Sequence, residues 1–204
     1  MKLKEGRIGM LEPGKERYTF ADMMASPDTE WVEIIHGKLY PMTPLGTVHQ
    51  TILMALMVQI ANQLKGQNAE AIQLIAVRPF EGPNDTPELV DTVLLPDISI
   101  LCAPRKFEEY GCKGVPNFIA EIISPTSRYM DTVLKLDIYQ NAGVREYWVI
   151  DPESKSINIY VRDYDSKGLR LLNEKICSGT IELSVLEGVS VNVDELFVAK
   201  INSV

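Results

Sequence analysis

The hydrophobic positions along the chain follow two different periods, which together outline the secondary structure. The clearest helical period runs over residues 47–65, where apolar side chains recur every three or four positions. The members of this stripe are Ile52, Leu53, Leu56, Met57, Ile60 and Leu64. A second helix is predicted over 126–143, with Thr126 or Ser127 as its cap and Gly143 as its stop.

Shorter apolar segments predict strands, because they have strand length and turn residues lie between them. They cover residues 71–80, 93–102, 117–124, 146–151, 157–161 and 169–175. A hairpin is predicted over 30–42, where two apolar runs flank His36 and Gly37. A short helix is predicted after Thr19, with Asp22 in the capping-box position. A charged connection is expected over 104–116, and a final short helix over 194–197.

The order of these elements predicts an α/β fold with a mixed central sheet flanked by helices. A chain of 204 residues suits one domain with a well-formed core. Residues 1–18 are polar and poorly patterned, so we expect an N-terminal arm followed by a single domain over 19–204.

The charge balance limits the choice of partners. The chain carries 28 acidic and 20 basic residues, a net charge of −8. Such a chain is poorly suited to coat nucleic-acid phosphates, unless a divalent metal inverts the charge of its site.

The cysteines and the hydropathy pattern favour a cytoplasmic protein. The three cysteines, Cys102, Cys112 and Cys177, form no Cys-x-x-Cys pair, which is typical of reduced thiols and not of a zinc site or a disulfide framework. No run of about 18 apolar residues occurs, so we expect neither a signal peptide nor a membrane span.

Two carboxylates stand in segments that otherwise look like buried strands. Asp97 lies in VLLPDISIL and Glu121 in NFIAEIIS, where an isolated charge is costly without a partner. If the two strands are neighbours, both side chains can meet on one face and would repel each other. A hard cation such as Mg²⁺ removes this conflict. Glu33, in WVEII, is placed in the same unusual way.

A lysine completes the candidate site. Asp131, Lys135 and Tyr139 are spaced i, i+4, i+8, so they share one face of the second predicted helix. Beside two metal-binding carboxylates, Lys135 would be suited to orient a water molecule or to contact a phosphate.

Each of these residues also has a purely structural interpretation. Asp97 could cap a bend at Pro96, Glu121 could pair with Arg78, and Lys135 could pair only with Asp131. Glu33 could lie on the wet face of a hairpin, and His49 could be a polar residue of a first helical turn. Trp148 and Tyr147 are expected in the core. Four basic residues could form a phosphate-facing rim or could simply be solvated: Arg105, Lys106, Lys113 and Arg128.

The residues carry a resemblance to a known family. A Pro-Asp dipeptide on one strand and a Glu on the next resemble the PD-(D/E)XK phosphodiesterases, which have the restriction-endonuclease fold. The segments WVEIIHGKLYPMTP, LLPDISIL, PNFIAEIISPTS and DTVLKLDIYQNAGVREYWVIDP, together with His49, resemble the Uma family of bacterial restriction-type endonucleases. The resemblance runs from about residue 18 to about residue 161, and it implies a restriction-endonuclease-like core with extra β-hairpins.

The resemblance also implies roles for individual residues. The lysine that the superfamily has two positions after the glutamate is replaced here by Ile123, and Lys135 on the following helix is the match. Asp97 and Glu121 would bind the metal together with the backbone carbonyl of Ile122, and Glu33 would be an accessory carboxylate.

The expected function is therefore a Mg²⁺- or Mn²⁺-dependent endonuclease that hydrolyses DNA phosphodiester bonds with a metal-activated water. His49, Arg128 and Ser124 are candidate substrate contacts. A homodimer would suit two cuts on a duplex, although nothing in the sequence requires it.

Two other functions remain open. The acidic charge and the absent lysine at position 123 favour a binding or regulatory module without turnover. A sugar hydrolase that uses two carboxylates and no metal is the third hypothesis.

Overall fold

The computed structural model describes residues 15–25, 31–102 and 107–197, and a six-stranded mixed sheet forms its centre. The strand order is β11-β10-β9-β8-β5-β3, in which β8 and β9 are parallel and the other neighbours are antiparallel. Their bounds are Ala69–Ile72 (β3), Ile98–Cys102 (β5), Phe118–Ile122 (β8), Glu146–Asp151 (β9), Ser156–Arg162 (β10) and Leu169–Ile176 (β11). The predicted mixed sheet is confirmed.

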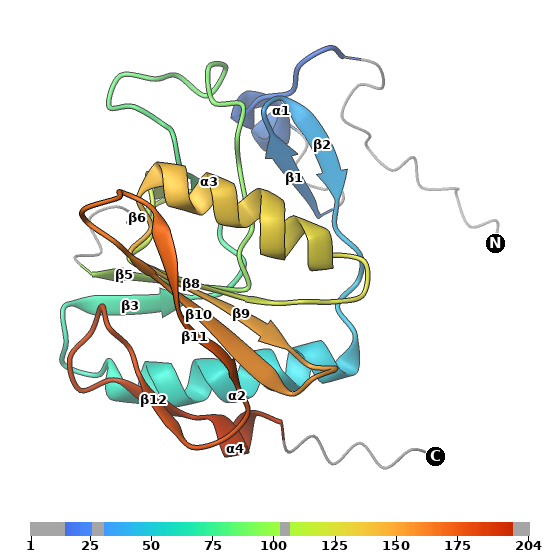
Figure 1. Ribbon diagram of the computed structural model, residues 1–204. Helices are drawn as coiled ribbons and strands as arrows, with labels where there is room; N and C mark the ends of the chain where they lie inside the picture. The colour runs from blue at the N-terminus through green and yellow to red at the C-terminus, as the bar shows by residue number, and fades with distance from the viewer. Residues whose placement is uncertain (1–14, 26–30, 103–106, 198–204) are drawn as a thin grey trace, which may run out of the picture.

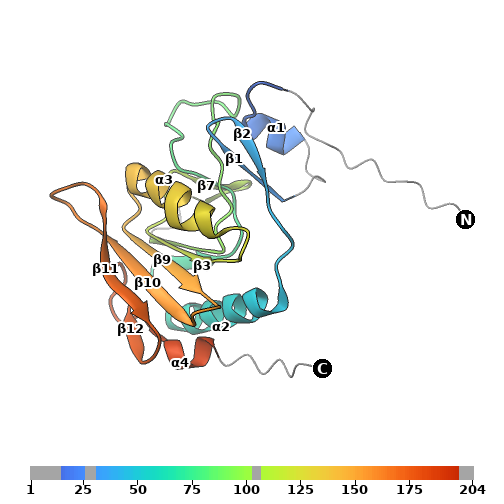
Figure 2. The same ribbon diagram turned by 45° about the vertical axis from the view of Figure 1, so that its right-hand side comes forward.

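Helices cover the two faces of this sheet (Figure 1). Helix α2 (Thr47–Gln63) packs on one face through the predicted stripe, and α3 (Lys135–Ala142) packs on the other. Strand β8 alternates between them: Ala120 contacts the cluster under α2, whereas Ile119 contacts the cluster under α3. Because both faces are covered, the central strands are apolar almost throughout. Figure 2 shows the same layers after a turn of 45° about the vertical axis.

The segment that leads into α3 begins at a reciprocal pair of serines. The Ser124 N–H donates to Ser127 Oγ (2.9 Å), and the Ser127 N–H donates to Ser124 Oγ (3.1 Å). This is the exchange of a capping box with Ser124 as the cap and Ser127 three residues after it, so the prediction of Thr126 or Ser127 as the cap is wrong. A π-helical turn, η2 (Met130–Leu134), follows and continues into α3, which ends at Gly143 with φ 95°.

The N-terminal elements match the sequence pattern closely. In α1 (Phe20–Ala25), Asp22 Oδ2 accepts from the Thr19 N–H at 2.8 Å, as a capping box requires. Strands β1 (Val32–Ile35) and β2 (Lys38–Pro41) form the predicted hairpin. Its two turn residues, His36 and Gly37, have φ values of 49° and 76°, which is the backbone of a two-residue hairpin turn.

Two segments differ from the prediction. The strand expected over 71–80 is broken: β3 ends at Ile72, and β4 (Val77–Arg78) pairs in a separate sheet. Leu74, with φ 53°, lies at the break, and its N–H donates to the Pro96 carbonyl. The expected connection over 104–116 contains β6 (Phe107–Glu108) and β7 (Gly111–Lys113), and β7 pairs with both β4 and β6.

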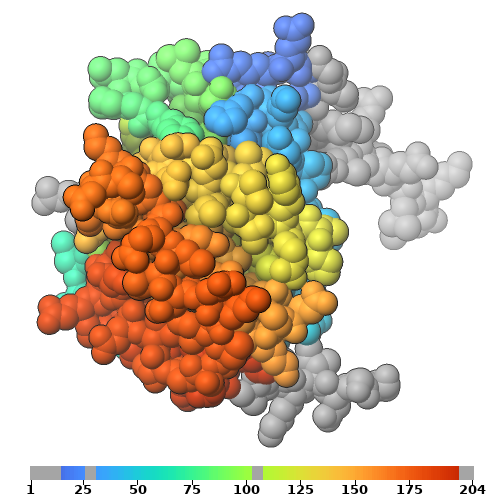
Figure 3. All heavy atoms as spheres, viewed as in Figure 1, coloured from blue at the N-terminus to red at the C-terminus, as the bar shows by residue number. Residues whose placement is uncertain are grey.

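The C-terminal part adds a small two-stranded sheet of β12 (Thr180–Glu182) and β13 (Ser190–Asn192), followed by α4 (Val193–Leu196). These elements pack beside α2. Strand β11 forms one edge of the central sheet and is largely exposed, on the face shown in Figure 3. Within the described ranges, no helix is long and apolar enough to cross a membrane.

Trp148 and Tyr147 are fully buried in the core, as predicted, and Trp148 is held by a buried carboxylate. Its Nε1–H donates to Glu146 at 2.7 Å, and the Val185 N–H donates to the other oxygen of Glu146 at 3.0 Å. Burial raises the pKa of Glu146, although these two hydrogen bonds act in the opposite direction.

Replacing Glu146 by glutamine is therefore expected to remove part of the pH dependence of folding. Because the pKa of Glu146 is higher in the folded state, the folded chain keeps a proton that the unfolded chain has lost. The free energy of unfolding of the wild type should thus rise as the pH falls through the folded pKa. Urea unfolding of both proteins at about pH 7.5 and about pH 5 measures this difference. The exposed control Glu182→Gln should follow the wild type, and an unchanged pH dependence in Glu146→Gln would contradict the prediction.

Candidate metal and phosphodiester site

A cavity of about 300 Å³ lies where β5 and β8 meet the start of α2 and the turn after β8. The sequence-predicted residues that line it are Glu33, His49, Asp97, Glu121, Ile122, Ser124 and Lys135. Its wall also includes the loop 42–46, which joins β2 to α2. The cavity thus collects side chains from segments that are far apart in the sequence.

The strand register brings the two predicted metal ligands together. Ile98 of β5 pairs with Ala120 of β8, which places Asp97 opposite Glu121. The Asp97 N–H donates to Glu121 Oε2 at 3.3 Å, and only 4% and 3% of the two residues are exposed. The expectation that these carboxylates come from neighbouring strands and meet on one face is met.

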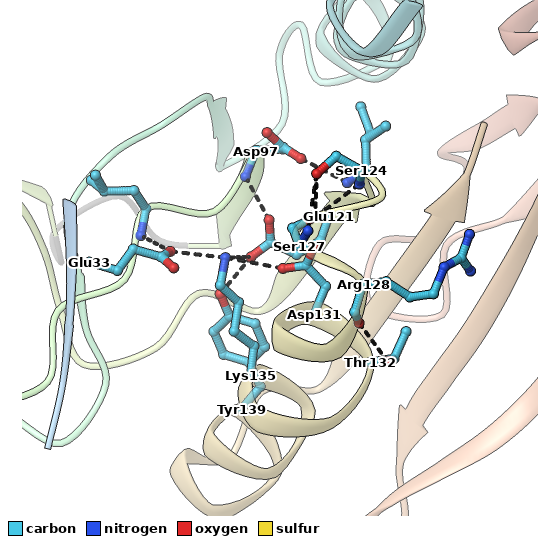
Figure 4. A network of polar contacts seen from close by, with 12 residues as sticks. Glu33, Asp97, Glu121, Ser124, Ser127, Arg128, Asp131, Thr132, Lys135 and Tyr139 are labelled. Atoms are coloured by element: carbon cyan, nitrogen blue, oxygen red, sulfur yellow. Dashed lines mark hydrogen bonds and ion pairs between the residues drawn. The ribbon is translucent and has the colours of Figure 1, made fainter. Parts of the chain in front are cut away.

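Lys135 lies among three carboxylates (Figure 4). Its Nζ is 2.9 Å from Glu33 Oε1, 3.1 Å from Glu121 Oε1 and 3.3 Å from Asp131 Oδ1. An ammonium has three donors, so each carboxylate can accept one of them. The interpretation of Lys135 as the partner of Asp131 alone is therefore wrong, and so is the pairing of Glu121 with Arg78. Arg78 instead pairs with Glu81 and Glu108.

Further hydrogen bonds hold Glu33 and Glu121 in place. The Leu95 N–H donates to Glu33 Oε1 at 2.9 Å, and the Tyr139 hydroxyl donates to Glu121 Oε1 at 2.9 Å. Glu33 is 3% exposed, so it does not lie on a wet hairpin face. In addition to Lys135, Glu33 is thus oriented by one backbone donor, and Glu121 by the Tyr139 hydroxyl and the Asp97 N–H.

Asp97 is oriented through only one of its oxygens. Its Oδ2 accepts from the Ile122 N–H at 2.7 Å and lies 3.0 Å from His49 Nε2. Its Oδ1 has no hydrogen bond within the part of the chain that the structure describes. His49, at the start of α2, is itself buried, and its Nδ1 has no hydrogen-bond partner among the described residues. Asp97 therefore presents one unpaired carboxylate oxygen beside the cavity.

The cluster carries more negative than positive charge. Four buried carboxylates lie in it: Glu33, Glu121 and Asp131 contact the single lysine, and Asp97 contacts His49. Burial raises the pKa of Glu121 well above its ordinary value; Lys135 opposes this, and the other three carboxylates add to it. Burial also raises the pKa of Asp131, against the effect of Lys135. Burial lowers the pKa of Lys135, but its carboxylate partners outweigh burial and hold that pKa well above its usual range.

These residues fit a hard divalent cation bound by two carboxylates. In the described ranges, no three His, Cys, Asp or Glu side chains are arranged to enclose a metal ion. Mg²⁺ is commonly held by only one or two carboxylates and keeps several of its waters. The free Oδ1 of Asp97, its neighbour Glu121 and the surplus of carboxylates over lysine match that kind of site. Ile122, whose backbone carbonyl the family resemblance implies as a third ligand, borders the same cavity.

Not all of the predicted substrate contacts line the cavity. Ser124 lines the cavity, although its hydroxyl is engaged by Ser127 and Thr126. Arg128 does not line it, and its guanidinium pairs with Asp151 and Glu153.

The rest of the expected basic rim is not assembled at the cavity either. Lys113 pairs with Glu81, away from the cavity lining. Arg105 and Lys106 lie outside the described residues. Lys135 is therefore the single lysine or arginine among the described residues that line the cavity.

Three members of the site were not assigned a role from the sequence. Asp131 and Tyr139 both contact the cluster directly, and their i, i+4, i+8 spacing with Lys135 was the signal that could have included them. Thr43 is a third such residue: it lines the cavity, and its hydroxyl lies 3.3 Å from that of Thr126 across the mouth. Nothing in the sequence pattern marks Thr43.

Comparison with known proteins places this arrangement in a family. A family model described as "Putative restriction endonuclease", Uma2, matches residues 18–194. The chain belongs to the Uma2 family. The resemblance expected from the sequence segments is thereby confirmed, and the family match extends beyond them to α4.

A solved structure supports the Uma2 fold. A crystal structure from Anabaena variabilis, described as a putative nuclease belonging to DUF820, superposes with a TM-score of 0.66 at 19% identity. The superposition covers 88% of this chain and 97% of that one. At this identity the similarity concerns the fold alone. No curated protein sequence matches the chain.

Proposed function

We propose that the chain is a divalent-metal-dependent nuclease that hydrolyses phosphodiester bonds in DNA. One observation carries the proposal: four buried carboxylates and one lysine meet at a cavity, and two of the carboxylates come from adjacent strands. Membership of a family described as restriction endonucleases supports the same reaction class.

The residues have distinct roles in this proposal. Asp97 and Glu121, with the carbonyl of Ile122, would hold the cation. A divalent cation there supplies charge stabilisation at a phosphoryl oxygen and lowers the pKa of a water. The Ile122 N–H and His49 orient Asp97 by binding its Oδ2, which leaves Oδ1 unpaired.

Lys135 acts mainly as an anchor for the acidic residues. Its ammonium pairs with Glu33, Glu121 and Asp131. It contacts Glu121 at Oε1, whereas the Asp97 N–H contacts Oε2, so the two donors hold Glu121 from opposite sides. To contact a phosphate, Lys135 would have to release one of these three partners. Lys135 is therefore primarily a positioning residue, and it can contact a phosphate only after it releases one of these carboxylates.

The direct test combines a binding and a cleavage measurement on the wild-type protein. Manganese titration by calorimetry should give one saturable site, and plasmid and single-stranded DNA should be cut with Mg²⁺ or Mn²⁺ and not with excess EDTA. A chain that binds no manganese and cuts neither DNA would contradict the proposal.

A binding module without turnover is the second candidate, and one observation favours it. Lys135 is fully engaged, and no other lysine or arginine lines the cavity among the described residues, so the site as formed offers little cationic surface to a phosphate. DNA binding that does not need a metal, together with silent calorimetry, would support this function over the first.

Replacing His49 is expected to weaken metal binding without unfolding the protein. In His49→Ala, Asp97 Oδ2 loses one of its two donors, so the carboxylate is less well oriented. Loss of such an outer-shell partner typically costs 10–100-fold in metal affinity, and we expect a loss of about 10-fold for manganese. His49→Gln retains an N–H donor and should recover part of the affinity, which loss of packing alone would not predict. Equal affinities in all three proteins would refute this role.

A further inference from the structure

Two exposed aromatic residues border the cavity that holds the carboxylates. Trp31 precedes β1, and its carbonyl accepts at 2.7 Å from the N–H of Met42, which lines the cavity. Tyr129 follows the turn after β8 and lies between Ser127 and Met130, which also line it. The exposed fractions of Trp31 and Tyr129 are 55% and 69%. Each of these two walls thus carries a water-exposed aromatic residue beside the cavity.

The two walls meet at a group of hydroxyls. Thr43 Oγ1, from the loop 42–46, lies 3.3 Å from Thr126 Oγ1 of the turn after β8, and Ser124 Oγ lies 3.1 Å from the same Thr126 atom. Figure 1 shows both segments along one side of the molecule. Thr43 and Thr126 are exposed, so either hydroxyl can exchange this contact for a phosphate oxygen. Neutral hydroxyls are common partners of phosphates in complexes with nucleic acids.

The charges around the cavity favour a single strand over a duplex. The net charge is −8, and the one lysine or arginine among the described lining residues, Lys135, is engaged by three carboxylates. A duplex carries one negative charge per about 1.7 Å of its axis, roughly twice the density along one strand, and it binds through lysines and arginines that neutralise its phosphates. Stacking of bases on aromatic rings does not need such residues. A single strand is therefore repelled less and gains more from this surface.

Burial of the carboxylates determines which part of the strand enters. Asp97 and Glu121 are 4% and 3% exposed, so a phosphate has to enter the cavity to reach a cation held by them. A volume of about 300 Å³ is at the lower end of the range for pockets that hold one small molecule. Such a pocket suits a phosphodiester group and leaves the flanking bases outside. In an unpaired strand these bases are free to stack on exposed rings, whereas in a duplex they are already stacked on one another.

We propose that the cavity takes single-stranded DNA, and that Trp31 and Tyr129 stack on the bases that flank the entering phosphate. This substrate class rests on the proposed nuclease function, which it makes more specific. Phe80, Tyr110 and Tyr164 are also exposed, but none of them lines the cavity or is next in the chain to a lining residue. Nicking of a supercoiled plasmid is compatible with this substrate class, since negative supercoiling favours local strand separation.

Binding of short DNA by the full chain tests the site directly. A fluorescently labelled strand of about 12 nucleotides, within the usual site size of single-strand-binding folds, and its duplex are titrated by anisotropy. Ca²⁺ is the cation, and a gel confirms that the DNA stays intact. The strand should bind at least about 10-fold more tightly than the duplex, because only its bases are free to stack. Because few phosphates meet a cationic group, a plot of log affinity against log salt concentration should have a slope no steeper than about −1.5.

Variants of the two aromatic residues test their role. Trp31→Ala and Tyr129→Ala should each weaken binding of the strand by at least about 5-fold, the lower limit for loss of one stacked base. Trp31→Phe and Tyr129→Phe keep an aromatic ring and should stay within about 3-fold of the wild type. All four variants should keep the wild-type manganese affinity in calorimetry, which would show that the carboxylate site is intact. Tyr164→Ala and Phe80→Ala remove exposed rings elsewhere and should leave binding of the strand unchanged.

The outcomes separate this site from the proposed function. A duplex that binds as tightly as the single strand, or alanine variants of Trp31 and Tyr129 that both retain the wild-type affinity, would overturn the stacking site. Metal-dependent cleavage in the same preparations would leave the nuclease function standing in that case. Conversely, a strand that binds tightly to the wild type and weakly to both alanine variants, but is never cut with Mg²⁺ or Mn²⁺, would support the stacking site and contradict the nuclease function.

Discussion

Asp97→Asn and Glu121→Gln are each expected to lower metal-dependent DNA cleavage by at least about 10³-fold, because the bound cation supplies several kcal/mol of charge stabilisation. Both replacements keep the shape of the side chain and one oxygen acceptor, and they remove its charge. In Asp97→Asn, the new amide oxygen can still accept from the Ile122 N–H. In Glu121→Gln, the new amide oxygen can still accept from the Tyr139 hydroxyl, although the amide nitrogen replaces the oxygen that accepts from the Asp97 N–H. The loss would therefore come mainly from the missing negative charge.

The measurement is the rate of plasmid nicking at saturating Mn²⁺, combined with calorimetric manganese affinity for the same preparations. Asp165→Asn and Glu182→Gln make the same chemical changes at exposed positions and should retain full activity. A Glu121→Gln protein that cuts at the wild-type rate would refute the assignment of Glu121. Lost cleavage with unchanged manganese affinity would place the two carboxylates in another role than metal binding.

The pairing of Asp97 and Glu121 could be predicted because it depends on a local irregularity and on one assumption about neighbouring strands. A carboxylate within an apolar strand is costly enough to signal a function. The register of β5 and β8 places both side chains opposite each other, as expected for neighbouring strands. The predicted helices and hairpin could be found for a similar reason, since their period and turn residues are local properties.

The parts that could not be predicted depend on contacts between distant segments. Glu33 reaches Lys135 because the first hairpin lies against the loop before β5: Ile34 pairs with Val93, and the Leu95 N–H donates to Glu33. Glu33 was a candidate for the site, but nothing between residues 33 and 135 indicates its ion pair with Lys135. Arg128 shows the opposite case: it pairs with Asp151 at the end of β9 and with Glu153 just after it, and it does not line the cavity.

The break after β3 and the buried arginine have a similar explanation. Residues 71–80 are apolar enough to form one strand, but Val77 finds its partners on β7 and at Leu94 instead. Arg78 then enters an acidic pocket of its own with Glu81 and Glu108. Tertiary pairing of this kind overrides local propensity, and it also removes Arg78 as a partner for Glu121.

Lys135→Met is expected to destabilise the protein by about 3–5 kcal/mol in the absence of divalent metal, because it leaves buried charges without their partner. Methionine fills a similar volume, so loss of packing contributes little. For a chain of this size, the expected fall in melting temperature is roughly 6–20 °C. The exposed Lys38→Met substitution removes the same charge at the surface and should change the melting temperature by no more than about 2 °C.

The same variant distinguishes a metal site from a purely structural ion cluster. If Glu33, Glu121 and Asp131 lose their ammonium, a divalent cation becomes the remaining source of positive charge in the cavity. Millimolar Mn²⁺ or Ca²⁺ should then raise the melting temperature of Lys135→Met by more than that of the wild type, through preferential binding to the folded state.

Lowering the pH should also stabilise the folded state of Lys135→Met. Without Lys135, which lowers the pKa of Glu121, that pKa rises further, so the folded state gains protons as the pH falls and becomes more stable relative to the unfolded state. Thermal unfolding monitored by circular dichroism, with and without metal, measures both effects. A Lys135→Met protein as stable as the wild type, or one indifferent to divalent cations, would mean that the carboxylates do not form a cation-binding cluster.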